Sequence, residues 1–146
     1  MKSSYKRPES VLILVTTGAG EVLMMERTSP HGFWQSVTGS LRWGESAPAA
    51  AARELTEETG LRGGHLLKDL HTGVRFPIVP PWRARYAPAA HFNHEYWFVL
   101  ELAARRTVRL NLEEHRQYRW MPATEAVHRA SSWTNRKLIR AWMAWQ

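Results

Sequence analysis

Three glutamates stand close together in one stretch of this 146-residue chain, at a spacing that suits a divalent metal ion. They are Glu54, Glu57 and Glu58. Residues three and four positions apart lie on one face of an α-helix, so on a helix these carboxylates would crowd together and repel each other. A hard cation that prefers oxygen ligands removes that conflict. The alternative interpretation is a solvated acidic helix face with one salt bridge, which is the commoner meaning of such a charge run.

The residues around the glutamates predict the helix itself. Ser46 is a good N-cap, Gly60 is placed to end the helix, and most residues between them are good helix formers. Leu55 belongs to an apolar stripe that can pack on a sheet. Arg53 precedes Glu57 by four positions, so it can hold part of the acidic cluster in place.

A glycine-bearing loop precedes this helix, and the whole run from Gly39 to Leu61 reads GSLRWGESAPAAAARELTEETGL. Gly39 is expected to allow a tight turn where the backbone approaches a ligand or metal. Five residues separate it from Glu45. In these fixed positions the run resembles the complete signature of the Nudix hydrolases. The resemblance implies hydrolysis of a diphosphate linkage with Mg²⁺, for which Mn²⁺ can substitute. It also implies an α/β/α sandwich with a central mixed sheet and a catalytic loop-helix-loop.

Composition and charge narrow the class of protein. Hydrophobic residues make up 44% of the chain, which argues against disorder, and no apolar run is long enough to span a membrane. The beginning, MKSSYKRPES, has no signal-peptide core, and the absence of cysteine fits a reducing compartment, so a cytoplasmic location is expected. The net charge of +7 favours polyanionic partners. The basic residues are dispersed, so a small-molecule triphosphate is expected as partner rather than nucleic acid.

Strand and helix patterns on both sides of the predicted helix indicate one α+β domain over residues 1–146 with a mixed sheet. The proline-rich residues 75–88 are expected to form a loop, since proline this dense excludes a helix or a central strand. Two more helices are expected at residues 122–130 and 132–145. Strands or extended segments are expected at residues 10–16, 21–27, 33–38, 66–72, 90–102, 107–110 and 117–120.

Short pieces outside the glutamate stretch extend the resemblance over nearly the whole chain. In chain order they are YKRP at residues 5–8, FWQSVTGS at 33–40, RYAP at 85–88, Glu114-His115, and SWTNR at 132–136. Together they are similar to the bacterial dihydroneopterin triphosphate diphosphatases, a Nudix family of folate biosynthesis that releases pyrophosphate and the monophosphate. The alternative is a Nudix enzyme that acts on ordinary or oxidised nucleoside triphosphates or on RNA 5′ ends. A binding module without catalysis would have lost a glutamate of the signature, and none is lost here.

The resemblance assigns roles to individual residues. It implies Glu54, Glu58 and Glu114 as metal ligands, with Glu57 as a further ligand or as the base that activates water. Glu57, Glu58 and Arg53 form the expected catalytic set. The expected substrate contacts are Lys6, Arg27, Thr38, Phe76, Pro77, Ile78, Val79 and Ser132.

Each assignment has a plain alternative. Lys6 and Arg27 are alternatively solvated cations, Glu114 a partner of Arg116, and Ser132 the N-cap of the last helix. His115 and Trp34 are expected to be structural rather than a metal ligand and a base-stacking platform. Glu58 is expected to face the metal at the surface, so that losing its charge would abolish turnover with little effect on folding stability.

Overall fold

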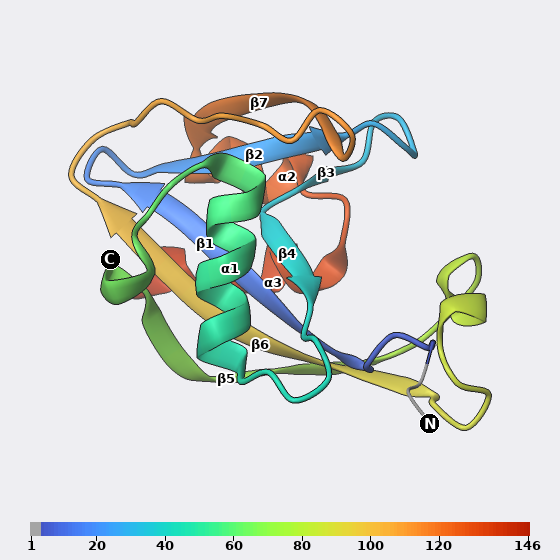
Figure 1. Cartoon of the computed structure of the whole chain (residues 1–146). Helices are drawn as coiled ribbons and strands as arrows, with labels where there is room; N and C mark the ends of the chain where they lie inside the picture. Colours follow the sequence, from blue (N-terminus) through green and yellow to red (C-terminus); the bar gives the residue numbers. More distant parts are fainter. Residues whose placement is uncertain (1–3) are drawn as a thin grey trace.

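The computed structural model describes residues 4–146 and has a mixed β-sheet at its centre (Figure 1). The strands follow the order β3-β2-β1-β6-β5, while β4 pairs with β1 and β7 pairs with β2. The pair β1–β6 is parallel and the other pairs are antiparallel, so the sheet is mixed as expected. The strands are β1 (Glu9–Thr17), β2 (Glu21–Arg27), β3 (Trp34–Gln35), β4 (Val37–Ser40), β5 (Lys68–Pro77), β6 (Phe92–Leu102) and β7 (His115–Pro122).

Helices cover both faces of this sheet. The helix α1 (Ala47–Thr59) lies on one face, and α2 (Ala123–Arg129) and α3 (Trp133–Ala144) lie on the other (Figure 1). Alternate residues of β1 point to the two layers, as a strand requires. Val11 and Ile13 pack in the core with α1, whereas Leu12 and Leu14 pack in the core with α2 and α3. The expected α+β sandwich is therefore confirmed.

The ends of α1 agree with the sequence prediction. The side chain of Ser46 accepts a hydrogen bond from the backbone of Ala49 at 3.2 Å, and Gly60 ends the helix in the left-handed conformation with φ of 75°. The prediction of a strand at residues 107–110 is wrong. This segment is irregular and lies along the end of α1, where Arg109 donates its backbone N–H to Thr59 at 2.9 Å and Val108 is buried. Its apolar residues cover the helix terminus instead of forming a strand.

The proline-rich segment begins later than expected, because β5 continues to Pro77 instead of ending near residue 72. Since β5 is at the edge of the described sheet, proline is tolerated there. The remainder is a loop interrupted by one 3₁₀ turn, η2 (Trp82–Arg85), where no helical turn was expected. A second 3₁₀ turn, η1 (Gly64–Leu66), follows α1.

No helix in residues 4–146 has the length and apolar character needed to cross a membrane. Residues 1–3 of the expected single domain lie outside the described part of the chain, and the division of the chain into one domain stays a prediction.

Candidate active site

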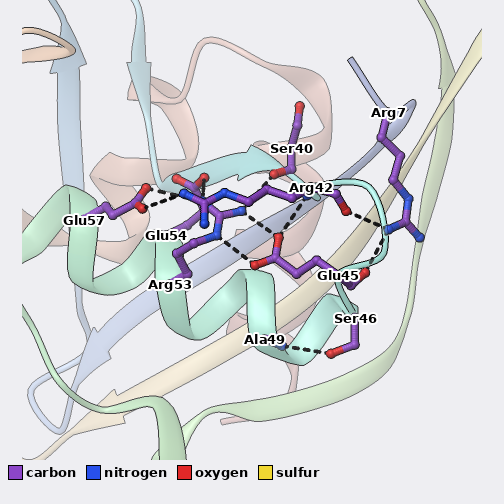
Figure 2. Close-up of polar contacts among 9 residues, drawn as sticks. All are labelled: Arg7, Ser40, Arg42, Glu45, Ser46, Ala49, Arg53, Glu54 and Glu57. Atoms are coloured by element: carbon purple, nitrogen blue, oxygen red, sulfur yellow. Dashed lines mark hydrogen bonds and ion pairs between the residues drawn. The ribbon is translucent and has the colours of Figure 1, made fainter. Parts of the chain in front are cut away.

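Arg53 ties the helix α1 to the loop that precedes it (Figure 2). Its guanidinium donates to both carboxylate oxygens of Glu45 at 2.7 and 2.8 Å, to Glu54 at 2.7 Å and to the carbonyl of Ser40 at 3.1 Å. The hydrogen bonds to Glu45 are the main reason that the pKa of Arg53 is raised. The same bonds lower the pKa of Glu45 to about 2. Loop and helix are therefore held as one unit by a charge pair with two parallel hydrogen bonds.

The loop is also fastened to the N-terminal segment. Arg7 donates to the backbone carbonyls of Arg42 at 2.9 Å and Glu45 at 2.8 Å (Figure 2). The loop turns at Gly44, which has a φ of +84° that side chains other than glycine rarely adopt. Lys6, the neighbour of Arg7, donates its backbone N–H to Arg85 at 2.9 Å.

Glu57 lies at the exposed edge of the helix. Its side chain is 48% exposed and forms ion pairs with Arg53 at 3.3 Å and Arg42 at 3.5 Å (Figure 2). The predicted contact between Arg53 and Glu57, four residues apart, is thus present. The side chain of Glu57 remains accessible to a solvent molecule.

Glu58 is buried, which contradicts the expectation of a surface carboxylate. It is 1% exposed, and neither carboxylate oxygen has a hydrogen-bond partner in the described part of the chain. Burial, followed by the neighbouring Glu54 and Glu114, raises the pKa of Glu58 well above its usual range. The backbone amide of Thr38 opposes the shift without meeting hydrogen-bond geometry. An ionised carboxylate in this position needs a cation.

Glu114 and His115 at the beginning of β7 come close to Glu58. Each of these three side chains offers one ligand atom, and the three atoms lie within 4.8 Å of one another. Burial, with Glu54 as the next cause, raises the pKa of Glu114. The alternative pairing of Glu114 with Arg116 is not seen, since Arg116 lies 3.7 Å from Glu26 instead. The predicted ligand Glu54 is not one of these three residues. Two carboxylates, one of them buried and unpartnered, still fit a divalent cation.

His115 is itself a member of this cluster, with its Nε2 3.9 Å from Oε1 of Glu58, so its expected structural role stays a prediction. Its Nε2 lies 3.1 Å from the side-chain nitrogen of Gln35. Burial, and to a smaller degree Arg27, lowers the pKa of His115 to about 4, so the ring is neutral at pH 7. Trp34 is 6% exposed and belongs to the core with α3, in agreement with its expected structural role.

Gly39 does not form the turn that was expected. It lies within β4 and pairs with Val11 of β1. A Cβ atom at this position would overlap the carboxylate of Glu54. The backbone at Gly39 is closely approached by the side chain of Glu54, not by the ligand or metal that was expected.

One cleft of about 950 Å³ contains all eight residues expected to contact substrate. Glu54 and Glu114 line the same cleft, so the acidic cluster opens into it. Burial lowers the pKa of Lys6, with Arg85 and then Arg27 as further causes, because three cations face each other there. This part of the cleft favours a polyanion. The eight expected contacts that line the cleft as a whole are Lys6, Arg27, Thr38, Phe76, Pro77, Ile78, Val79 and Ser132.

The model of the NUDIX domain family matches residues 6–143 of this chain. The chain belongs to the Nudix family. It is 40% identical to the dihydroneopterin triphosphate diphosphatase of Escherichia coli K12, over 92% of this chain and 91% of that protein. The enzyme of the same name from Haemophilus influenzae is 34% identical over 95% of this chain and 89% of its own length. The solved structure of the E. coli dihydroneopterin triphosphate pyrophosphohydrolase has a TM-score of 0.86 at 39% identity, covering 95% of this chain and 97% of that one.

Several polar residues of the Nudix cleft were missed by the sequence analysis. Asn93 and Glu95 on β6 and Arg85 in the proline-rich loop all line the cleft. The strand pattern carried a signal for the first two, because they share the parity of the buried Trp97 and Val99. Polar residues that continue the buried side of a strand indicate a site.

Proposed function

We propose that this chain is a metal-dependent diphosphatase that hydrolyses dihydroneopterin triphosphate to dihydroneopterin monophosphate and pyrophosphate. One observation supports this proposal above the others: a single cleft joins the acidic cluster of α1 and β7, a group of cations, and a partly apolar slot. Metal, phosphates and ring of such a substrate therefore each have a matching region. The relatives named for this activity are similar over nine-tenths of the chain.

The residues proposed to hold the metal are Glu54, Glu58 and Glu114, and Mg²⁺, with Mn²⁺ as a substitute, is the proposed ion. The unpartnered buried carboxylate of Glu58 supports this assignment, as does the approach of Glu54 through the space left by Gly39. When bound, such an ion neutralises phosphate charge and lowers the pKa of a water molecule. Glu57 remains open as a further ligand or as the proton acceptor.

The protein's own residues then bind and orient the substrate. Lys6 and Arg27 contribute positive charge to the phosphate chain in the cleft. Arg53 is a positioning residue, because its bonds to Glu45 and Glu54 fix the carboxylates relative to the loop. Glu57, whose side chain is 48% exposed, is available to accept a proton from the attacking water.

The proposed ring slot lies beyond the phosphate region. Phe76 and Ile78 provide apolar surface, and Ile78 is only 9% exposed. At the other wall, Ser132 caps α3 by accepting from Asn135 at 3.1 Å. Its hydroxyl also lies 3.4 Å from that of Thr134, and if Thr134 is the donor of this pair, the hydrogen of Ser132 can go to a ligand. A slot with apolar walls and a few polar groups suits a flat heterocycle.

A substrate panel with product analysis tests this function. We expect phosphorus NMR to show pyrophosphate as the first product, and kcat/KM for dihydroneopterin triphosphate to exceed that for each common nucleoside triphosphate at least roughly tenfold, or about 1.4 kcal/mol. Orthophosphate as the first product, without pyrophosphatase, would contradict the proposed bond cleavage. Equal activity on dATP or an oxidised guanine nucleotide would favour nucleotide clean-up. A soluble phosphorylated substrate and a chain without cysteine are consistent with the cytoplasm as the proposed location.

A further inference from the structure

The floor of the cleft on the α3 side of the sheet is polar, although the strand beneath it runs on into the core. Asn93 and Glu95 stand two residues apart on β6, so their side chains lie on the same face as that of Trp97. Asn93 is 2% exposed and Glu95 is 6% exposed, and both line the cleft. Burying polar groups here costs free energy unless they find partners.

Asn93 has only half of its hydrogen-bonding groups paired. Its side-chain nitrogen donates to the hydroxyl of Ser10 at 2.8 Å. Its Oδ1 is buried and has no partner in residues 4–146. An unpaired buried carbonyl oxygen is costly, and a ligand that donates a hydrogen bond removes that cost.

Glu95 is the second acceptor of this floor. One of its oxygens accepts from the indole N–H of Trp97 at 3.0 Å, and the hydroxyl of Thr134 lies close to the carboxyl group. No cation of the described residues pairs with it; burial raises its pKa, and the contacts with Trp97 and Thr134 counteract this. A buried carboxylate without a cation has capacity to accept further hydrogen bonds.

An apolar wall stands beside these two acceptors. On the neighbouring strand β5, Phe76 is directly opposite Asn93 and Val74 is directly opposite Glu95. Opposite residues of an antiparallel pair point to the same side of the sheet. The α carbons of Asn93 and Glu95 are about 7 Å apart along the strand, since each residue rises about 3.3 Å. The space between them matches one edge of a flat ring.

Acceptors at this position select a ring whose edge carries several N–H donors. The 2-amino-4-oxopyrimidine half of a pterin presents an amino group and a ring N–H side by side. Adenine presents an amino group beside a ring nitrogen that accepts. We propose that Glu95 and Asn93 recognise this edge of the pterin ring by hydrogen bonds. The carboxylate of Glu95 accepts from the ring N–H and the amino group, and Oδ1 of Asn93 accepts from the amino group.

This inference rests on the proposed function, and the variant Glu95→Gln tests it. Glutamine keeps the shape and can keep an oxygen towards Trp97, but it replaces one acceptor with an N–H₂ donor. A donor facing the donors of the ring leaves buried groups unpaired. We expect kcat/KM for dihydroneopterin triphosphate to fall about thirtyfold or more, mainly through KM, and kcat/KM for dATP to change less than about threefold.

A matched control lies on the same strand. Glu101 forms an ion pair with Lys68 and does not line the cleft. We therefore expect Glu101→Gln to leave kcat/KM unchanged for both substrates. Thermal unfolding of each variant shows whether the fold is kept. Loss of activity on both substrates alike in folded Glu95→Gln would make Glu95 a structural residue and overturn the inference.

The wild-type protein separates the two proposals. If it does not prefer dihydroneopterin triphosphate to each common nucleoside triphosphate, the proposed function fails. If it does not prefer dihydroneopterin triphosphate even to dATP, the recognition of the pterin edge fails as well. If the wild-type preference exists and survives unchanged in Glu95→Gln, the function stands and this inference alone is wrong. A wild-type preference over every nucleoside triphosphate, together with a preference over dATP that falls in the variant, supports both.

Discussion

Replacing Glu58 by glutamine is expected to make the metal-free protein more stable, not less. The carboxylate is 1% exposed, has no hydrogen-bond donor in the described residues and lies near Glu54 and Glu114. Leaving a buried polar group unpaired costs about 1–3 kcal/mol, and a charged group costs more. Glutamine has nearly the same shape, removes the charge, and can donate its N–H₂ to a neighbouring carboxylate.

The sign of the pH dependence follows from the raised pKa of Glu58. The folded state favours the protonated acid, so the contribution of Glu58 to the free energy of unfolding is fully present below the usual pKa of glutamate. That contribution is lost as the pH rises through the raised value of the folded state. The advantage of Glu58→Gln over the wild type should therefore be largest near pH 8 and disappear towards pH 4.

The expected gain at pH 8 in EDTA is about 2 kcal/mol, taken from the cost of an unpaired buried group. For a chain of this size, 1 kcal/mol corresponds to about 4 °C in melting temperature, so the variant should melt roughly 8 °C higher. Mg²⁺ at a hundred times its Kd should stabilise the wild type by about 2.7 kcal/mol and the variant much less. Turnover should be lost in the variant.

Calorimetry or circular dichroism melting curves with and without Mg²⁺ provide the measurement. The variant Glu57→Gln is the control, because this carboxylate is on the same helix but 48% exposed and paired with Arg53. Its free energy of unfolding should change by no more than that of a surface ion pair, about 1 kcal/mol or less, which is about 4 °C or less in melting temperature. If Glu58→Gln melts at or below the wild type in EDTA at pH 8 while keeping its fold, the idea of an unpaired buried charge is refuted.

Three further expectations concern the surroundings of the same cluster. Arg53→Lys keeps the charge but loses the planar fork that bridges Glu45 and Glu54, so steady-state kinetics should show kcat falling about a hundredfold with a smaller change in KM. Gly39→Ala adds a methyl group where the carboxylate of Glu54 lies, so Mg²⁺ titrations should show weaker binding, and unchanged binding would contradict the packing. Because the folded-state pKa of His115 is lowered to about 4, the protein loses stability as pH falls from about 6.5 towards 4, and His115→Asn in EDTA should show a smaller drop in melting temperature between pH 7 and pH 5.

The local features that depend on neighbouring residues were predictable from the sequence. Ser46 and Gly60 bound α1 as expected, because caps act through the backbone a few residues away. Burial was harder to predict. Glu58 has the same spacing on the helix as an exposed acid, and only the packing of α1 against β4 and β7 decides that it is covered. The prediction of a strand at residues 107–110 was wrong for the same reason, because the apolar residues of this segment pack at the end of α1 and not in a sheet.

The two halves of the site lie on opposite faces of the sheet, which explains why the sequence signature covers only one of them. Glu54 stands on the α1 side, against Gly39, whereas Glu95 lies on the α3 side with Trp97. Both nevertheless line the same cleft. The signature fixes a helix and the loop before it, so it determines the chemistry on its own face. The residues proposed to recognise the ring lie on strands and a helix cap far along the chain, outside the signature.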